Sequence, residues 1–294
     1  MRALSSAPSG DASMKEATMA AKSTKSAKPA KVAKSTKPVT AAKSAPKAAA
    51  ARLTCAEVMK ELAKLGSEQT RKIYARHCAG EPTFGVQFGL LKGLLKRIGV
   101  DHELAQALWE TGNFDARNVA MKIADPARTD ATELDRWAAV DRGRMCGSYV
   151  AMLASEGPHG PALAKKWLAA KDLPRRCSGW LLVGQLATHD DALADDWFAA
   201  HLATIEKSIH AAPNAQREPM NMAVIQIGGR NAALRKAATA AAKRIGTLEV
   251  DHGDTSCETP DAAETIEKLW ARAGTKFTSP AAQERARERQ RLRC

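Results

Sequence analysis

The sequence has few aromatic residues and no long apolar run. Aromatic side chains make up 4% of the 294 residues, whereas alanine is abundant, and this mix favours helices that pack closely through small side chains. No run of alternating β-branched residues is long enough to predict a strand. No apolar stretch approaches the roughly 20 residues of a membrane span, and the N-terminus lacks the apolar core of a secretory signal. We therefore expect an all-α, soluble, cytoplasmic protein without a membrane partner.

Paired cysteines are also missing. The six cysteines include no CxxC pair, and most lie inside helical patterns as small apolar residues. They are Cys55, Cys78, Cys146, Cys177, Cys257 and Cys294. Reduced thiols are therefore expected. Asp251, His252, Asp254 and Cys257 place metal-type side chains in one loop, but their spacing matches no zinc signature. We predict no metal and no cofactor.

The segment from Asp101 to Pro126 shows the unit from which the chain is built. Asp101 is expected to cap a first amphipathic helix that ends at Gly112, and Asn113 to cap a second that Pro126 stops. Two antiparallel helices leave one apolar side exposed to water, so they need a neighbouring pair. A chain of such pairs forms a helical solenoid.

Similar signals recur along the chain. Thr54 with Glu57, and Asp130 with Glu133, have the spacing of a capping box. Thr259-Pro260 and Ser279-Pro280 each predict an N-cap followed by proline at the first helical position. A helix is expected to open at Asn214, with Pro219 as a candidate break, and another to run from Asn231 to Gly246. The pattern predicts six or seven helix pairs over residues 53–273, then a basic helix or tail at 279–294.

Tryptophans recur at helical positions within this pattern. Large aromatic side chains dominate core burial, so we expect these residues to pack between helices more often than to stack on bases. The residues concerned are Trp109, Trp137, Trp167, Trp180 and Trp197.

The net charge of +13 lies mostly at the two ends. Residues 1–50 carry +8 and residues 281–294 carry +3, which leaves +2 for residues 51–280. The first 50 residues are a disordered, low-complexity polycation in this interpretation. Their AKPAK and STKP phrases are similar to linker-histone tails. We predict that they bind DNA phosphates, with a solubilising extension as the alternative. The lysines in question recur every third residue: Lys22, Lys25, Lys28, Lys31, Lys34 and Lys37.

Four consecutive phrases carry a family resemblance. KELAKLGSEQTRKIYARH, FGVQFGLLKGLLKRI, DHELAQALWETGNFDAR and KIADP, within Leu53 to Trp270, resemble the DNA alkylation repair family of HEAT-like repeats. Its best-known members are alkylpurine DNA glycosylases. The resemblance implies a stack of helix pairs with a basic concave face for double-stranded DNA. It also implies an aspartate that stabilises positive charge on the sugar as the glycosidic bond breaks, framed by tryptophans and accompanied by an arginine.

This sequence departs from the family at the catalytic positions. The family's first tryptophan and its aspartate fall at Gly143 and Gly147, and the second tryptophan falls near Ile225. The family arginine is matched by Arg176, which is therefore predicted to contact the DNA backbone. Asp135 and Asp141 lie upstream, and Asp141 is the candidate for a relocated carboxylate. A carboxylate one turn away does not substitute easily, because this kind of catalysis is sensitive to distance.

Three functions remain open from the sequence. The first is a DNA-binding protein, monomeric and associated with the nucleoid, that acts in alkylation repair or nucleoid organisation without the catalytic aspartate. The second is an active glycosylase for N3- or N7-alkylated purines that uses a displaced carboxylate. The third is a protein-interaction scaffold on the same helical repeats.

Overall fold

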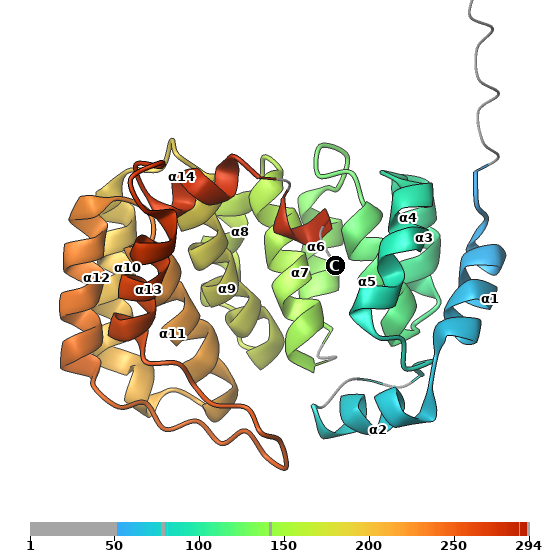
Figure 1. Cartoon of the computed structure of the whole chain (residues 1–294), viewed down its shortest axis with the longest axis horizontal. Coiled ribbons are helices and arrows are strands. Elements are labelled where there is room, and N and C mark those ends of the chain that lie inside the picture. The colour runs from blue at the N-terminus through green and yellow to red at the C-terminus, as the bar shows by residue number, and fades with distance from the viewer. Residues whose placement is uncertain (1–51, 78–79, 81, 141–142, 288, 293–294) are drawn as a thin grey trace, which may run out of the picture. The chain divides into compact units, whose positions relative to one another are not determined.

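The computed structural model describes residues 52–77, 80, 82–140, 143–287 and 289–292. Figure 1 shows a structure built from helices, and these residues include no β-strand, which confirms the all-α prediction. In the described part of the chain, no helix is long and apolar enough to traverse a bilayer. The α-helices are α1 (Cys55–Leu65), α2 (Glu68–Arg76), α3 (Leu91–Ile98), α4 (His102–Glu110), α5 (Phe114–Ile123), α6 (Ala131–Ala138), α7 (Gly143–Glu156), α8 (Gly160–Leu168), α9 (Leu173–His189), α10 (Asp195–Ser208), α11 (Asn214–Gly228), α12 (Ala232–Ile245), α13 (Ala262–Ala273) and α14 (Pro280–Arg285). Short 3₁₀ turns lie at Phe88–Leu90, Ile209–Ala211 and Gln290–Leu292.

The helices from α4 to α12 alternate between two layers. Helices α5, α7, α9 and α11, here called the inner helices, pack against one another in that order. Helices α4, α6, α8, α10 and α12 pack against them from the other layer. Pairs such as α4 with α5 and α8 with α9 therefore repeat as the sequence predicts (Figure 1).

Most predicted helix starts are confirmed. Asp101 and Asn113 accept hydrogen bonds from the backbone N–H groups of Leu104 and Ala116, and Thr54 forms a complete capping box with Glu57. The prediction at Thr259-Pro260 was wrong, because Asp261 caps α13 two residues later. An aspartate side chain is a strong N-cap, so it takes this role from the neighbouring threonine.

Glu133 does not complete the second predicted capping box. Asp130 accepts the N–H of Glu133 at 2.8 Å, as expected. The Glu133 carboxylate, however, is 8% exposed and lies 3.6 Å from the ring of the equally buried His102 on α4. The side chain therefore joins α6 to α4.

A buried carboxylate fixes the loop before α3. Asp115, in the first turn of α5, accepts hydrogen bonds from the backbone N–H groups of three consecutive residues, from Phe84 to Val86, at 2.6 to 3.1 Å. Gly85 within this loop has φ 75°, and a Cβ there would lie 2.6 Å from the carbonyl oxygen of Ser67. Only glycine fits this close approach without strain.

The tryptophans are mainly core residues, as predicted. Trp109, Trp137 and Trp167 are at most 2% exposed, and Trp180 is also buried. The rings of Trp109 and Trp137 stack with centroids 4.4 Å apart. Trp197 is half-buried. These side chains therefore fill the space between helix pairs.

The described residues of the C-terminal segment 279–292, here called the C-terminal strap, cross the C-terminal ends of the inner helices. Ser279 caps α14 with Pro280 in its first turn, as predicted. Ala281 donates its N–H to the carbonyl oxygen of Gly229, just after α11. Arg285 then donates to the carbonyl oxygen of Thr188 in the last turn of α9.

The strap continues to α7 and α5. Arg289 lies 3.4 Å from the carboxylate of Glu156 at the end of α7. Arg291 is 2% exposed, bonds the same carboxylate at 2.7 and 3.0 Å, and donates to the carbonyl oxygens of Met121 and Lys122 on α5. Positive side chains stabilise the negative ends of helix dipoles. The arginines of the strap therefore hold α5, α7 and α9 at one end, and the backbone of Ala281 adds the end of α11.

Candidate nucleic-acid interface

A pocket of about 500 Å³ lies at the opposite, N-terminal ends of α7, α9 and α11. The end of α2 adds Arg76 and His77, and the loop between α12 and α13 adds Asp251 and His252. We call it the groove pocket. Its apolar lining includes Val140, Leu173, Pro174, Leu181, Ala215, Pro219 and Met222. Its uncharged polar lining includes Ser148, Cys177, Ser178, Asn214 and Thr255.

The loop between α12 and α13 is tied to α11 by paired hydrogen bonds. Asn214 donates from Nδ2 to the carbonyl oxygen of Asp251 at 2.7 Å, and its Oδ1 accepts the N–H of Asp251 at 2.8 Å. Arg217 donates to the carbonyl oxygen of Glu249 at 2.9 Å. The prediction that a helix opens at Asn214 is confirmed, but its amide holds the loop instead of capping the helix. These bonds position one wall of the groove pocket.

Pro219 does not break α11, which runs continuously from Asn214 to Gly228. A proline has no N–H to donate to the carbonyl oxygen four residues earlier, which here belongs to Ala215. The thiol of Cys177 on α9 lies 3.3 Å from this oxygen and donates to it. The Cys177 thiol thus replaces the N–H that Pro219 lacks, and this hydrogen bond joins α9 to α11 within the pocket lining.

Two kinds of electrostatic influence meet at the pocket. The N-terminal ends of α9 and α11 carry the positive ends of helix dipoles, which attract anions such as phosphate. At α9 this effect is partly offset, because Asp172 caps the helix, whereas at α11 the N-cap residue Pro213 offers no side-chain hydrogen bond. Glu218 and Asp251 place carboxylates within the lining itself. The helix N-termini and Arg76 therefore favour phosphates at this pocket, and the two carboxylates oppose them.

The positions predicted to correspond to the family's catalytic residues lie beside this pocket. Gly143 and Gly147 belong to the first part of α7, and Ser148, the next residue, lines the pocket. Glycine supplies neither a carboxylate nor an aromatic ring. Ile225, near the second tryptophan position, is 2% exposed and belongs to the core of α11.

Arg176 does not line the groove pocket, although Pro174, Cys177 and Ser178 do. Its guanidinium donates to the carbonyl oxygens of Ala170 at 3.3 Å and Lys171 at 2.7 Å, just after α8. Its role in DNA contact stays a prediction. The side chain also has a structural task, which is to satisfy carbonyl groups between α8 and α9.

Asp135 is occupied by structural contacts. It accepts hydrogen bonds from Trp167 at 3.0 Å and from Arg175 at 3.1 and 3.2 Å, and it pairs with Lys166 at 3.2 Å. Its burial opposes these contacts, yet the net effect keeps the pKa of Asp135 below its usual value. This carboxylate therefore bridges α6, α8 and α9 as a stable anion.

Several predicted residues lie outside the described part of the chain. They are Asp141 and the tail lysines Lys22, Lys25, Lys28, Lys31, Lys34 and Lys37. Within the described residues, no group of three histidine, cysteine or acidic side chains is arranged to hold a metal ion. Cys55, Cys177 and Cys257 form no disulfide within the described residues.

Sequence reasoning missed Glu218 as a groove residue. Its only local signal is that it precedes Pro219 near the start of a helix. A proline there leaves the carbonyl oxygen four residues earlier without its usual helical N–H donor. Its neighbours in the pocket come from α9 and from the loop after α12, which are distant in sequence. The grouping of Glu218 with these residues is therefore apparent only in the folded structure.

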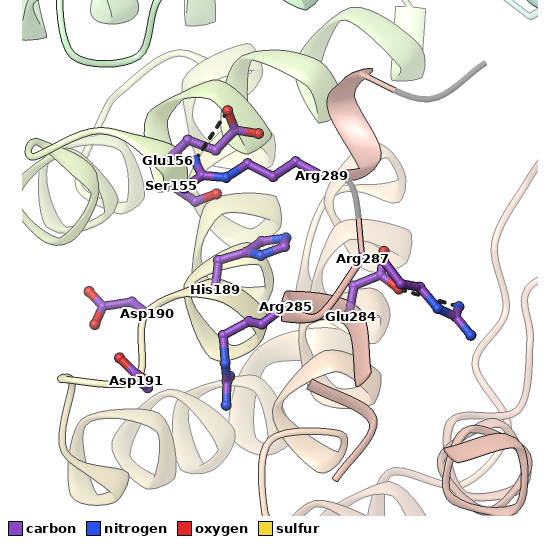
Figure 2. Close-up of a pocket in the computed structure, with 9 residues that line it drawn as sticks. All are labelled: Ser155, Glu156, His189, Asp190, Asp191, Glu284, Arg285, Arg287 and Arg289. Carbon is purple, nitrogen blue, oxygen red and sulfur yellow. Dashed lines mark ion pairs between the residues drawn. The ribbon is translucent and has the colours of Figure 1, made fainter. Parts of the chain in front are cut away.

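A second pocket of about 380 Å³ lies beneath the strap (Figure 2). Arginines of the strap and acidic residues of α7 and the strap pair within it, including Arg289 with Glu156 and Arg287 with Glu284. Burial is the main cause that lowers the pKa of His189 there. These internal pairs give this pocket a structural role in anchoring the strap.

Comparisons with known proteins agree with this architecture. Two uncharacterized relatives, Lin0241 of Listeria innocua and Lmo0209 of Listeria monocytogenes, are 27% and 26% identical over 222 residues, which is 74% of this chain and 97% of each relative. A solved structure is 31% identical with a TM-score of 0.69, covering 78% of this chain and 98% of that chain. It is described as "a new family of proteins related to the HEAT-like repeat DNA glycosylases with affinity for branched DNA structures".

The family assignment follows from the extent of these matches. The pattern that defines the DNA alkylation repair enzymes matches residues 58–266, which include α5, α7, α9, α11 and the whole groove-pocket lining. The solved structure shares the HEAT-like arrangement of helix pairs across nearly its whole length. This chain therefore belongs to the DNA alkylation repair family.

Proposed function

We propose that the protein binds DNA through the groove pocket and its rim, prefers branched DNA to linear duplex, and does not excise bases. The observation that carries this proposal is the common direction of the inner helices. The groove pocket adjoins the N-terminal ends of α7, α9 and α11, and the arginine-rich strap covers the opposite ends. Aligned helix dipoles give the groove side positive character although residues 51–280 carry a net charge of only +2.

The preference for branched DNA draws on the structural relative, which is described as having affinity for such DNA. A junction presents phosphates from several arms to one protein surface. A rim formed by Arg76, helix N-termini and the loop around Asp251 offers contacts on more than one side of the pocket. Phosphate contacts position the DNA without reading its sequence.

We infer that base excision does not occur because the family resemblance places the catalytic carboxylate at position 147, where this chain has glycine. A positive charge that builds on deoxyribose needs a fixed negative charge nearby, and losing such a preorganised group costs about 10²–10³ in rate. Asp135 cannot take over without breaking its contacts with Trp167 and Arg175.

Two mobility-shift measurements test the binding proposal. The full chain and a chain that lacks residues 1–50 are titrated with a four-way junction and with a linear duplex of the same length and arm sequences. We expect both proteins to bind the junction more tightly than the duplex. If the shortened chain binds neither DNA, the folded part is not the DNA-binding element, and the scaffold alternative is favoured.

A glycosylase is the second candidate, and one observation favours it: Glu218 supplies a carboxylate to the groove pocket. Release of 7-methylguanine from duplex DNA, compared between the wild type and Glu218→Gln, tests it directly. We expect both proteins to match the spontaneous background. Turnover by the wild type that disappears in Glu218→Gln would establish excision by a displaced carboxylate.

A further inference from the structure

We propose that the loop between α12 and α13, here called the acidic loop, makes the protein prefer branched DNA because it repels a straight duplex from the groove pocket. This inference rests on the proposed binding of DNA at that pocket. It names the residues that decide between the two kinds of DNA.

The acidic loop consists of residues 246–261 and contains five carboxylates but no lysine or arginine. All five acidic residues are exposed, and they are Glu249, Asp251, Asp254, Glu258 and Asp261. This concentration of negative charge is unexpected at a surface that binds DNA, because like charges close to phosphates oppose binding. Contacts of the loop with DNA are therefore limited to bases and sugars.

The acidic loop forms a fixed wall of the groove pocket. Asp251, His252, Gly253 and Thr255 belong to the pocket lining, so Asp254 lies between two lining residues. The paired hydrogen bonds between Asn214 and Asp251 hold the loop to the start of α11. The negative charges therefore stay at the pocket.

Another wall of the same pocket is basic. Helix α2 contributes Arg76 and His77 to the lining, and in Figure 1 it lies on the same side of the inner helices as the acidic loop. Lys72 and Arg76 are exposed, lie one helical turn apart and form no ion pair with a described residue. The pocket thus presents two cations for phosphates on α2 and a row of carboxylates on the loop.

A straight duplex cannot use the basic wall without meeting the acidic one. DNA has a persistence length of about 50 nm, so a duplex does not bend within the width of one pocket. A duplex that lies on Lys72 and Arg76 and crosses the pocket brings its phosphates to the acidic loop. Each close pair of like charges in water lowers an equilibrium constant by about fivefold, and salt screens the effect beyond roughly 10 Å.

A junction avoids this repulsion because its arms leave the branch point in different directions. One arm can lie along α2 while the others turn away from the acidic loop. Specificity often depends on such a repulsive element directed against the wrong partner. The acidic loop therefore acts as the determinant of the preference for branched DNA.

Asp254 and Glu258 are the residues to replace. Their carboxylates have no hydrogen-bond or ion-pair partner among the described residues, whereas Asp251 accepts the N–H of Gly253 and Asp261 caps α13. Asp254→Asn/Glu258→Gln therefore removes two charges and leaves the loop in place. Ser256→Glu, at an exposed position of the same loop, makes the opposite change by adding one charge.

The test uses the full chain, a four-way junction and a linear duplex with the same arm sequences, and fluorescence anisotropy gives the dissociation constants. Asp254→Asn/Glu258→Gln should tighten duplex binding by about three- to tenfold and change junction binding by less than about twofold. Ser256→Glu should weaken duplex binding by about threefold and so increase the preference. Circular dichroism checks that each variant retains the helix content of the wild type.

Asp191→Asn/Asp196→Asn is the matched control. It makes the same change in net charge at two exposed positions, beside the pocket beneath the strap and in the first turn of α10. The control should keep the preference of the wild type. If the loop variant keeps it as well, or if the control loses it equally, the acidic-loop inference is overturned while the proposed function stands. A wild type that binds neither DNA, or binds both equally, overturns the proposed function too.

Lys72→Gln/Arg76→Gln tests the basic wall. Loss of two charged contacts to phosphates should weaken binding of the junction and of the duplex by about tenfold or more. Unchanged binding of both would mean that no DNA arm lies along α2, which also overturns the inference.

Discussion

Replacing Arg291 should destabilise the protein more than replacing any other residue of the strap. Its guanidinium contacts the carboxylate of Glu156 at 2.7 and 3.0 Å, and both side chains are at most 3% exposed. In Arg291→Met, a side chain of similar length remains but the buried carboxylate loses its main partner. Breaking a buried ion pair on one side costs about 3–5 kcal/mol. Arg289 lies 3.4 Å from Glu156 and still offsets part of its negative charge. We therefore expect a loss of stability in the lower half of this range.

The assay is unfolding by urea and by heat, followed by circular dichroism at 222 nm. For a folded part of this size, the expected loss of about 3–4 kcal/mol corresponds to a fall in the melting temperature of roughly 6–16 °C. Arg287→Met is the control, because Arg287 is exposed and pairs only at 3.8 Å with Glu284, and such surface pairs contribute about 0–1 kcal/mol.

The double variant Arg291→Met/Glu156→Leu separates two costs, the lost attraction between the two side chains and the burial of the Glu156 charge without its main partner. Replacing both members of a buried pair with apolar residues is often neutral or stabilising. The double variant should therefore recover much of the stability that Arg291→Met loses. A melting temperature of Arg291→Met within about 2 °C of the wild type, which corresponds to less than roughly 1 kcal/mol, would refute the reasoning.

Three further predictions concern DNA binding and pH. Deleting residues 1–50 should flatten the dependence of log affinity on log salt by several units, at roughly 0.9 per neutralised phosphate, and an unchanged slope would show that the tail does not bind DNA. In the shortened chain, Arg176→Ala should weaken duplex binding by about 1–3 kcal/mol. Loss of helix content in this variant would instead assign the effect to its contacts with the carbonyl oxygens of Ala170 and Lys171. Burial lowers the pKa of His189, so the unfolded chain binds the proton more readily. Stability should then fall as the pH drops below about 6.5, and His189→Asn should reduce that dependence in melting curves at pH 7.5 and 5.5.

Local patterns predicted the helices well because caps and apolar spacing act within a few residues. Asp101 and Asn113 accept hydrogen bonds from residues three positions later, so their role can be recognised from the sequence alone. Competition between neighbouring caps is harder to judge, as Asp261 shows by replacing Thr259 at the start of α13.

Contacts between distant segments could not be predicted in this way. Glu133 has the spacing of a capping-box residue, yet its partner is His102 on another helix. Arg291 belongs to a stretch that reads as a basic tail, although it is one of the most buried charged residues in the described chain. Glu218 enters the groove pocket through the packing of α11 beside α9. Such roles depend on tertiary neighbours that carry no local sequence signal.

The position of Arg291 also bears on the order of folding during synthesis. Its partners Met121 and Glu156 lie 170 and 135 residues earlier in the chain. Helix pairs make local contacts and can form as they leave the ribosome, N-terminal segments first. The ends of α5 and α7 must wait for Arg291 to emerge before Glu156 receives this cation. A nascent chain that stalls before Arg291 would therefore hold α1 to α14 and still expose an incomplete junction between α5 and α7 to chaperones and proteases.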